Sequence, residues 1–141
     1  ARRNAQHGGV AERVAFQAAG ATDYPDQRFG LLCFFDCLHD LGDPIAAARH
    51  AAKVLAPGGT VMLVEPFAHD QVEHNLSPVA RMYYAASTTI CCAHAISEGG
   101  SLVLGAQAGE ARLAEVFRKA AFRHFRRAIE TPFNLVFEAR L

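Results

Sequence analysis

The chain of 141 residues lacks a net charge, a long apolar run and any paired-cysteine motif. Lys and Arg number 14, as do Asp and Glu, so no basic excess favours nucleic acid. A local cluster at Arg123, Arg126 and Arg127 brackets an apolar run and favours a solvated face. No apolar stretch approaches the ~20 residues of a membrane span, and the polar opening Ala-Arg-Arg-Asn does not indicate a signal peptide. We therefore expect neither nucleic acid nor a membrane as partner.

Metal-binding patterns are also missing. The cysteines form no Cys-x-x-Cys pair and follow apolar patterns, which favours buried thiols and a reducing, cytoplasmic location; they are Cys33, Cys37, Cys91 and Cys92. A second group has a spacing that fits no well-defined metal site, namely His69, Asp70, Glu73 and His74. We expect no metal and interpret the latter segment as a solvated loop.

What the chain does contain is a strand–helix–strand pattern over residues 30–65. The almost wholly apolar run 30–35 is typical of a strand buried on both faces. Asp43-Pro44 resembles an N-cap followed by proline at the first helical position, and the helix should end at the glycines of residues 56–59. A second apolar strand follows over residues 60–65. A connection of this length predicts two parallel strands.

The remaining patterns complete an α/β domain. Alternation at Val14, Phe16 and Ala18 predicts a short strand, and residues 1–11 indicate the end of a helix and a turn. Further on, the spacing predicts helices over 79–95 and 110–121, and strands over 122–129 and 133–139. The short connection between these last two strands predicts an antiparallel hairpin. The sheet should therefore be mostly parallel and end in that hairpin.

Acidic residues and a histidine stand where the two parallel strands end. Asp36 follows the first strand, His39 comes three residues later, and Glu65 closes the second strand. The carboxyl ends of parallel strands open into the crevice where α/β proteins bind ligands, so these side chains should meet there. His39 is the natural candidate for proton transfer, because its pKa lies nearest neutrality. The alternative is a structural histidine, satisfied by Asp40 or Asp43.

Three stretches carry a resemblance to a known family. They are residues 34–43 (Phe-Phe-Asp-Cys-Leu-His-Asp-Leu-Gly-Asp), residues 55–65, and the closing strand, helix and hairpin. The chain resembles the C-terminal part of class I S-adenosylmethionine-dependent methyltransferases. It is similar to small-molecule O-methyltransferases and to bacterial members with a winged-helix domain. The resemblance implies one partial domain over residues 1–141: an incomplete Rossmann-like sheet without its first two strands, with helices on both faces. It also implies a substrate-lid insertion over residues 66–107.

The resemblance assigns roles residue by residue. It implies methyl transfer from S-adenosylmethionine to a small-molecule acceptor, most simply a hydroxyl oxygen, with His39 as base and Glu65 as its orienting partner. The implied cofactor neighbours are Gly20, Ala21, Phe34, Phe35 and Asp36, and the implied substrate neighbours are Phe67, Met82 and Tyr83. The alternatives are ordinary ones: Glu65 as a capping carboxylate, Asp36 as a solvated strand-end acid, and the apolar residues as packing, since Phe34 and Phe35 point to opposite faces.

The chain also departs from the family pattern. The glycine-rich cofactor loop is absent, and Gly20 stands where the family has an acid for the adenine, which Asp23 could replace only with a shifted loop. Without the family's first strand, one edge of strand 30–35 is exposed, so we expect a homo-oligomer or pairing with a missing N-terminal segment. The alternative to an enzyme is a non-catalytic oligomerisation or binding module.

Overall fold

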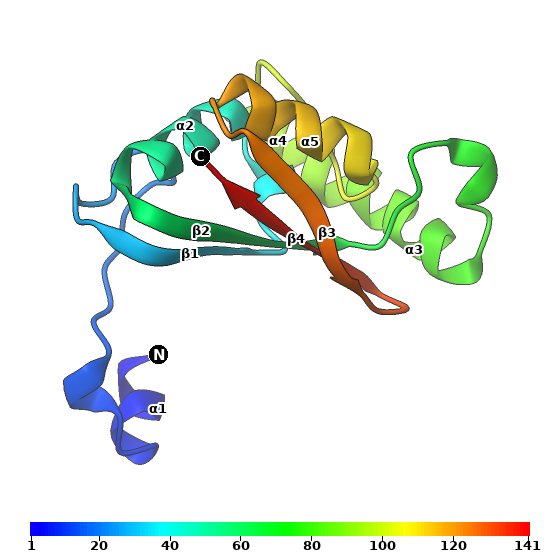
Figure 1. Ribbon diagram of the computed structural model, residues 1–141. Helices are drawn as coiled ribbons and strands as arrows, with labels where there is room; N and C mark the ends of the chain where they lie inside the picture. Colours follow the sequence, from blue (N-terminus) through cyan, green and yellow to red (C-terminus); the bar gives the residue numbers. More distant parts are fainter.

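A four-stranded sheet forms the centre of the computed structural model, which describes residues 1–141 (Figure 1). Its strands are β1 (Phe29–Phe35), β2 (Leu55–Pro66), β3 (His124–Glu130) and β4 (Asn134–Arg140). The order is β1-β2-β4-β3, with β1 parallel to β2 and the other pairs antiparallel. The predicted α/β class, the parallel pair and the closing hairpin are confirmed, but only the β1–β2 pairing is parallel, so the expectation of a mostly parallel sheet is wrong for these residues.

Two helices, α2 (Pro44–Val54) and α5 (Gly109–Lys119), cover one face of this sheet (Figure 1). On the other side, α1 (Arg2–His7) lies apart from the strands at the end of an extended segment. The insertion after β2 holds α3 (Pro78–Ala86), a π-helical turn (Ser87–Cys91) and α4 (Cys92–Ser97), one nearly continuous helical segment. Short 3₁₀ turns occupy Ala11–Arg13, Leu38–Asp40 and Val72–His74. None of these helices has both the length and the apolar character needed to cross a bilayer.

The core lies between the sheet and the α2–α5 layer. Because side chains alternate along a strand, every second residue of β2 and β4 points toward these helices. Val61 and Leu63 of β2 and Leu135 and Phe137 of β4 are fully buried there, together with Phe117 of α5. The same alternation places Glu65, two residues beyond Leu63, on this buried side.

Helix α2 begins where the sequence predicts. The Asp43 carboxylate accepts a hydrogen bond of 2.8 Å from the Ala46 backbone N–H, and Pro44 occupies the first turn. The small residues Ala47, Ala48 and Ala51 are fully buried against the sheet. The cap and the buried alanine face fix the start of α2, and so they fix the position of residues 36–42, which connect β1 to α2.

Strand β2 begins at Leu55, five residues earlier than predicted, and pairing with β1 is irregular between Phe29 and Leu31. A Cβ on Gly59 would stand 2.9 Å from the Phe29 carbonyl oxygen and from the Ala56 carbonyl oxygen. Only glycine permits this approach. The glycines therefore serve the irregular start of β2, whereas α2 ends earlier than expected, at Val54, with Leu55 already extended.

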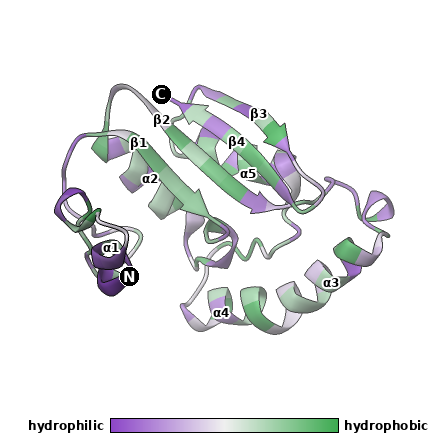
Figure 2. Cartoon of the chain, turned by 90° about the horizontal axis from the view of Figure 1, so that it is seen from below, coloured by the Kyte–Doolittle hydropathy of each residue, from purple (hydrophilic) through white to green (hydrophobic).

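The predicted strand at residues 14–18 is wrong: this segment is irregular and pairs with no other strand. An isolated extended segment has no partner for its backbone N–H and C=O groups, so alternation alone does not make a strand. No strand pairs with the outer edge of β1. No helix layer covers the face of the sheet opposite α2 and α5 (Figure 2).

Candidate functional site

The site candidates lie at the carboxyl ends of β1 and β2. The chain leaves β1 at Asp36 and forms the 3₁₀ turn Leu38–Asp40 before α2, which carries His39 toward the end of β2. His39 is 4% exposed and Glu65 is 2% exposed. The structure thus brings together the two residues predicted to meet from neighbouring strands.

His39 and Glu65 form a buried pair. The Nδ1 atom of His39 makes a short hydrogen bond to Glu65 Oε2, while Glu65 Oε1 accepts a hydrogen bond of 3.1 Å from the Leu38 backbone N–H. The carboxylate is therefore fixed at both oxygens. A carboxylate bonded to Nδ1 favours the tautomer with its proton there and leaves Nε2 as the basic nitrogen.

Burial acts on both members of this pair. Burial lowers the pKa of His39, but the hydrogen bond and charge of Glu65, with the charges of Asp40 and Asp36, outweigh it and raise that pKa above its ordinary 6.5. Burial raises the pKa of Glu65 above 4.5, against the opposing effect of His39. The folded pair therefore retains a proton more strongly than the two free side chains do.

The second nitrogen of His39 faces a residue next to it in sequence. Its Nε2 lies 3.2 Å from Asp40 Oδ1, which is buried, although the Asp40 side chain as a whole is 35% exposed. Burial and then the nearby Asp40 carboxylate raise the pKa of Cys91 to about 11, so its thiol stays protonated at neutral pH. Cys91 ends the π-helical turn, a feature that neither composition nor periodicity predicted.

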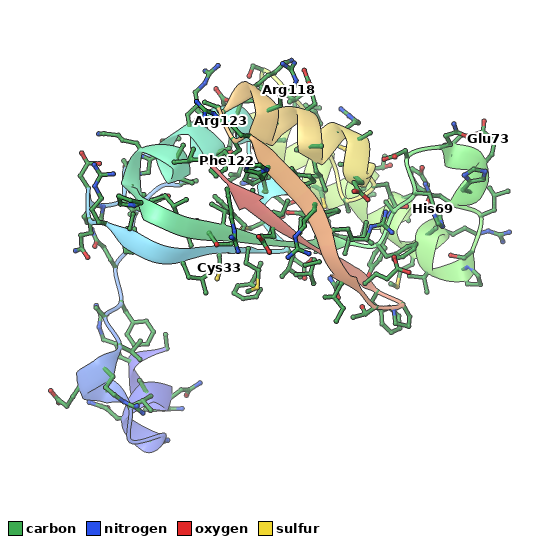
Figure 3. The ribbon with its side chains drawn as sticks, viewed as in Figure 1. Cys33, His69, Glu73, Arg118, Phe122 and Arg123 are labelled. Carbon is green, nitrogen blue, oxygen red and sulfur yellow. The ribbon has the colours of Figure 1, made fainter.

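His39, Asp40 and Cys91 are also the one group of three metal-type ligands whose donor atoms lie within 4.8 Å of one another. Residues 69–74, whose spacing fits no well-defined metal site, make other contacts. The Asp70 carboxylate accepts a 2.8 Å hydrogen bond from Ala111 N–H at the start of α5, and the His69 ring packs edge-on against Phe67. Figure 3 places His69 and Glu73 on the segment between β2 and α3.

Asp36 adopts a left-handed backbone conformation, with φ of 45°. Its exposed carboxylate accepts a hydrogen bond of 3.1 Å from the side-chain amide of Asn134, the first residue of β4. Non-glycine residues rarely take this conformation, and such strain gathers at functional sites. The sequence singled out Asp36, but Asn134 lies 98 residues away and carried no signal of its own.

The two phenylalanines at the end of β1 separate as alternation requires. Phe34 is 6% exposed in the core, whereas Phe35 is 62% exposed on the uncovered face. Phe34 is therefore the phenylalanine that packs in the core, and Phe35 is the one whose ring is accessible.

Gly20 and Ala21 lie in the segment before β1. A Cβ on Gly20 would stand 2.8 Å from Asp23 Oδ1, because a turn folds the Asp23 side chain back over Gly20. The Asp23 carboxylate therefore lies beside the backbone of Gly20. Ala21 is half-buried against the core.

The residues implied for the substrate side differ in exposure. Phe67 is half-buried against the core, and Met82 on α3 is 56% exposed. The Tyr83 hydroxyl donates a hydrogen bond of 3.1 Å to the Phe133 carbonyl in the β3–β4 turn. That turn therefore contacts the insertion.

The largest cavity does not contain these residues. It measures about 600 Å³ and lies at the opposite end of the sheet, between Arg28, Gly58 and His124. There the Arg28 guanidinium donates hydrogen bonds to the Lys53 and Leu55 carbonyl oxygens at the end of α2. The buried acid–base pair, not the cavity volume, marks the candidate site.

A sequence profile described as a methyltransferase domain matches residues 2–98, more than two thirds of the chain. The match includes β1, β2 and the His39–Glu65 pair.

Solved structures give the same answer for the fold. A protein from Nostoc punctiforme PCC 73102 assigned as an O-methyltransferase is similar with a TM-score of 0.72, 22% identity, and coverage of 98% of this chain and 40% of that protein. The mitomycin 7-O-methyltransferase MmcR matches at 0.69 and 14% identity, covering 99% and 38%. Human N-acetylserotonin methyltransferase, solved with S-adenosylmethionine, matches at 0.67 and 18% identity, covering 96% and 36%. The chain spans about two fifths of these proteins.

Proposed function

Since the chain belongs to the methyltransferase-domain family, we propose that it forms the acceptor side of an enzyme that methylates a hydroxyl oxygen of a small molecule with S-adenosylmethionine. The observation that carries this proposal is the buried pair of His39 and Glu65 at the ends of two parallel strands. A histidine oriented by a buried carboxylate is suited to remove the proton of a hydroxyl group.

The chain's own residues would position and deprotonate the acceptor. Glu65 holds the His39 ring through Nδ1, so the acceptor hydroxyl would approach Nε2 in the place now facing Asp40. The Nε2 atom of His39 would accept the hydroxyl proton as the acceptor oxygen takes up the methyl group. S-adenosylmethionine, when bound, supplies the methyl group and leaves as the neutral thioether. General-base help of this kind is worth roughly 10²–10⁴ in rate.

Three features of the strand ends fit a cationic cofactor. Asp36 presents an exposed carboxylate that is held by Asn134, and Phe35, the residue before it, presents an apolar ring. The Asp23 carboxylate lies beside Gly20, the position at which the family has an acid for the adenine. We include Gly20, Ala21, Phe35 and Asp36 in the proposed cofactor side. The glycine-rich loop of the family would have to come from outside residues 1–141.

The acceptor side would be the insertion. Phe67, Met82 and Tyr83 offer apolar and aromatic surface between β2 and α3, which suits a flat apolar acceptor. The half-buried Tyr83 is anchored by its hydroxyl, so its ring edge has a fixed direction.

Substitution of the base tests the proposal in the longest natural gene product that contains this chain. With labelled S-adenosylmethionine and a panel of phenolic acceptors, His39→Gln should lower kcat by about 10²–10⁴ and leave the KM for S-adenosylmethionine within about threefold. The matched control is His94→Gln, the same change on the exposed face of α4. An unchanged kcat in His39→Gln rejects the base role.

A second candidate function is a non-catalytic oligomerisation module. The observation that favours it is the free edge of β1 beside an uncovered apolar face. Titration calorimetry of residues 1–141 with S-adenosylmethionine at millimolar concentration distinguishes the two. No heat from this chain, together with methyl transfer by the longer product, means that the chain acts only together with the further residues of that product.

A further inference from the structure

The turn between β3 and β4 connects the cofactor side and the acceptor side of the proposed site. It is built by Thr131, whose hydroxyl accepts hydrogen bonds from the backbone N–H groups of Phe133 (3.2 Å) and Asn134 (2.9 Å). The Thr131 N–H in turn donates to the Asn134 carbonyl at 2.8 Å. This closed network gives Asn134 a defined position at the start of β4.

From that position the Asn134 amide reaches two other strands. Its Nδ2 donates to Asp36 Oδ1 at 3.1 Å, just beyond β1, and lies 3.4 Å from the Glu65 carbonyl oxygen in β2. One side chain thus joins the acid at the end of β1 to the backbone of the residue that orients His39.

Asp36 needs such a restraint. Its φ of 45° is costly for a residue other than glycine, although Asp tolerates it better than most. The backbone is held by the Asp36 N–H, which donates to the Val64 carbonyl at 2.8 Å, but the carboxylate is exposed and has Asn134 as its hydrogen-bond partner. Without Asn134 the carboxylate would sample several directions.

The adjacent residue of the same turn holds the insertion. The Phe133 carbonyl accepts a hydrogen bond from the Tyr83 hydroxyl at 3.1 Å and one from the Phe67 N–H at 2.8 Å. The charge of Asp36 also helps to raise the pKa values of Tyr83, His39 and Glu65. It therefore acts on residues of the acceptor side as well as on the cofactor side.

We propose that Asn134 is a positioning residue for methyl transfer: its amide fixes the left-handed Asp36 so that the carboxylate faces a bound cationic cofactor. This inference rests on the proposed function and deepens it. S-adenosylmethionine carries a sulfonium and an ammonium group, and a carboxylate with a fixed direction attracts them more strongly than a mobile one does. Asn134 would therefore govern cofactor affinity, whereas His39 governs the proton.

The test uses the longest natural gene product that contains this chain. Asn134→Leu keeps the size of the side chain and removes its donors. It should raise the KM for S-adenosylmethionine, and its Kd measured by titration calorimetry without an acceptor, about tenfold and leave kcat within about threefold. Asn134→Asp places a carboxylate against Asp36 and should raise the KM further. Asn4→Leu makes the same chemical change on α1, away from the sheet, and should change neither constant.

A double-mutant cycle separates positioning of Asp36 from a general structural effect. In an Asp36→Gly background, where the conformation is free of strain and the carboxylate is gone, Asn134→Leu should cause no further loss of affinity. An equal loss in both backgrounds, or an unchanged KM in Asn134→Leu, overturns the inference. A wild-type product that neither binds nor uses S-adenosylmethionine instead rejects the proposed function itself.

Discussion

The two faces of the sheet carry similar apolar residues in very different surroundings. On the face covered by α2 and α5, Leu63 and Phe137 are fully buried. On the uncovered face, the alternate residues Leu31 and Phe35 of β1 and Ile129 of β3 are 57%, 62% and 61% exposed. Figure 2 shows the strands of this face coloured mainly hydrophobic along β1 and β2, and in Figure 3 Cys33 points away from the helices. Strand β1 thus carries large apolar side chains on both sides, but residues 1–141 supply a covering layer on only one of them.

The first way to break this comparison is to truncate one phenylalanine on each face. Phe137→Ala should lower the free energy of unfolding by about 3–5 kcal/mol, because it opens a cavity between the sheet and α5. Phe35→Ala should cost less than about 0.5 kcal/mol, because the ring is already in water. Urea unfolding measures both. Equal costs would mean that Phe35 is buried in solution by another molecule.

The second prediction concerns what covers the apolar face. Leu31→Lys combined with Phe35→Lys should weaken self-association of residues 1–141 at least tenfold, since charge on an uncovered strand edge opposes pairing. Sedimentation velocity at high micromolar concentration gives the measurement. Ile96→Lys, an equally exposed site on α4, is the control. A wild-type chain that sediments as a monomer contradicts the expected oligomer.

The third prediction uses the buried pair on the covered side. Because the pKa of His39 is raised in the folded chain, the folded state binds more protons than the unfolded state above pH 6.5. Stability should therefore fall as pH rises from 6.5 through the raised pKa, by up to about 1.4 kcal/mol per pH unit for one proton. Glu65→Gln removes the main raising influence and should flatten this slope. An identical slope in thermal or urea unfolding would mean that another group is responsible.

The smallest expected effect is on the uncovered face. Arg126 and Glu138 face each other across β3 and β4 in an ion pair, with the arginine side chain 63% exposed. A double-mutant cycle with alanine should give a coupling of about 0–1 kcal/mol that disappears at molar salt. A coupling that resists salt would show that water is excluded from this face.

Much of the fold was predictable because its signals are local. Asp43-Pro44 caps α2 whatever surrounds it, and the parallel pair brings His39 to Glu65 because both follow neighbouring strand ends. The strand expected at Val14 failed because pairing requires a neighbour, which a pattern within one segment does not reveal.

The unpredicted parts of the site depend on contacts between distant segments. Asn134 reaches Asp36 from 98 residues away, through a turn whose composition indicated only a hairpin. The Cys91 thiol, at the end of the π-helical turn, lies within 4.8 Å of the Asp40 carboxylate. The fold of Asp23 over Gly20 depends on the conformation of one turn. None of these three contacts follows from residue type and spacing, since both are compatible with many other partners.

The π-helical turn over Ser87–Cys91 has a genetic consequence. Such a turn contains one residue more than the α-helical turn it replaces, and each residue rotates a helix by about 100°. Loss of a single codon between residues 87 and 91 would therefore restore an α-helical turn and leave α3 and α4 presenting the same faces to the rest of the molecule. The segment after α4 has no such tolerance: the Gly105 N–H donates a hydrogen bond of 3.2 Å to the His39 carbonyl, and Ala106 and Ala108 are buried, so an insertion or deletion there would displace the turn that carries His39.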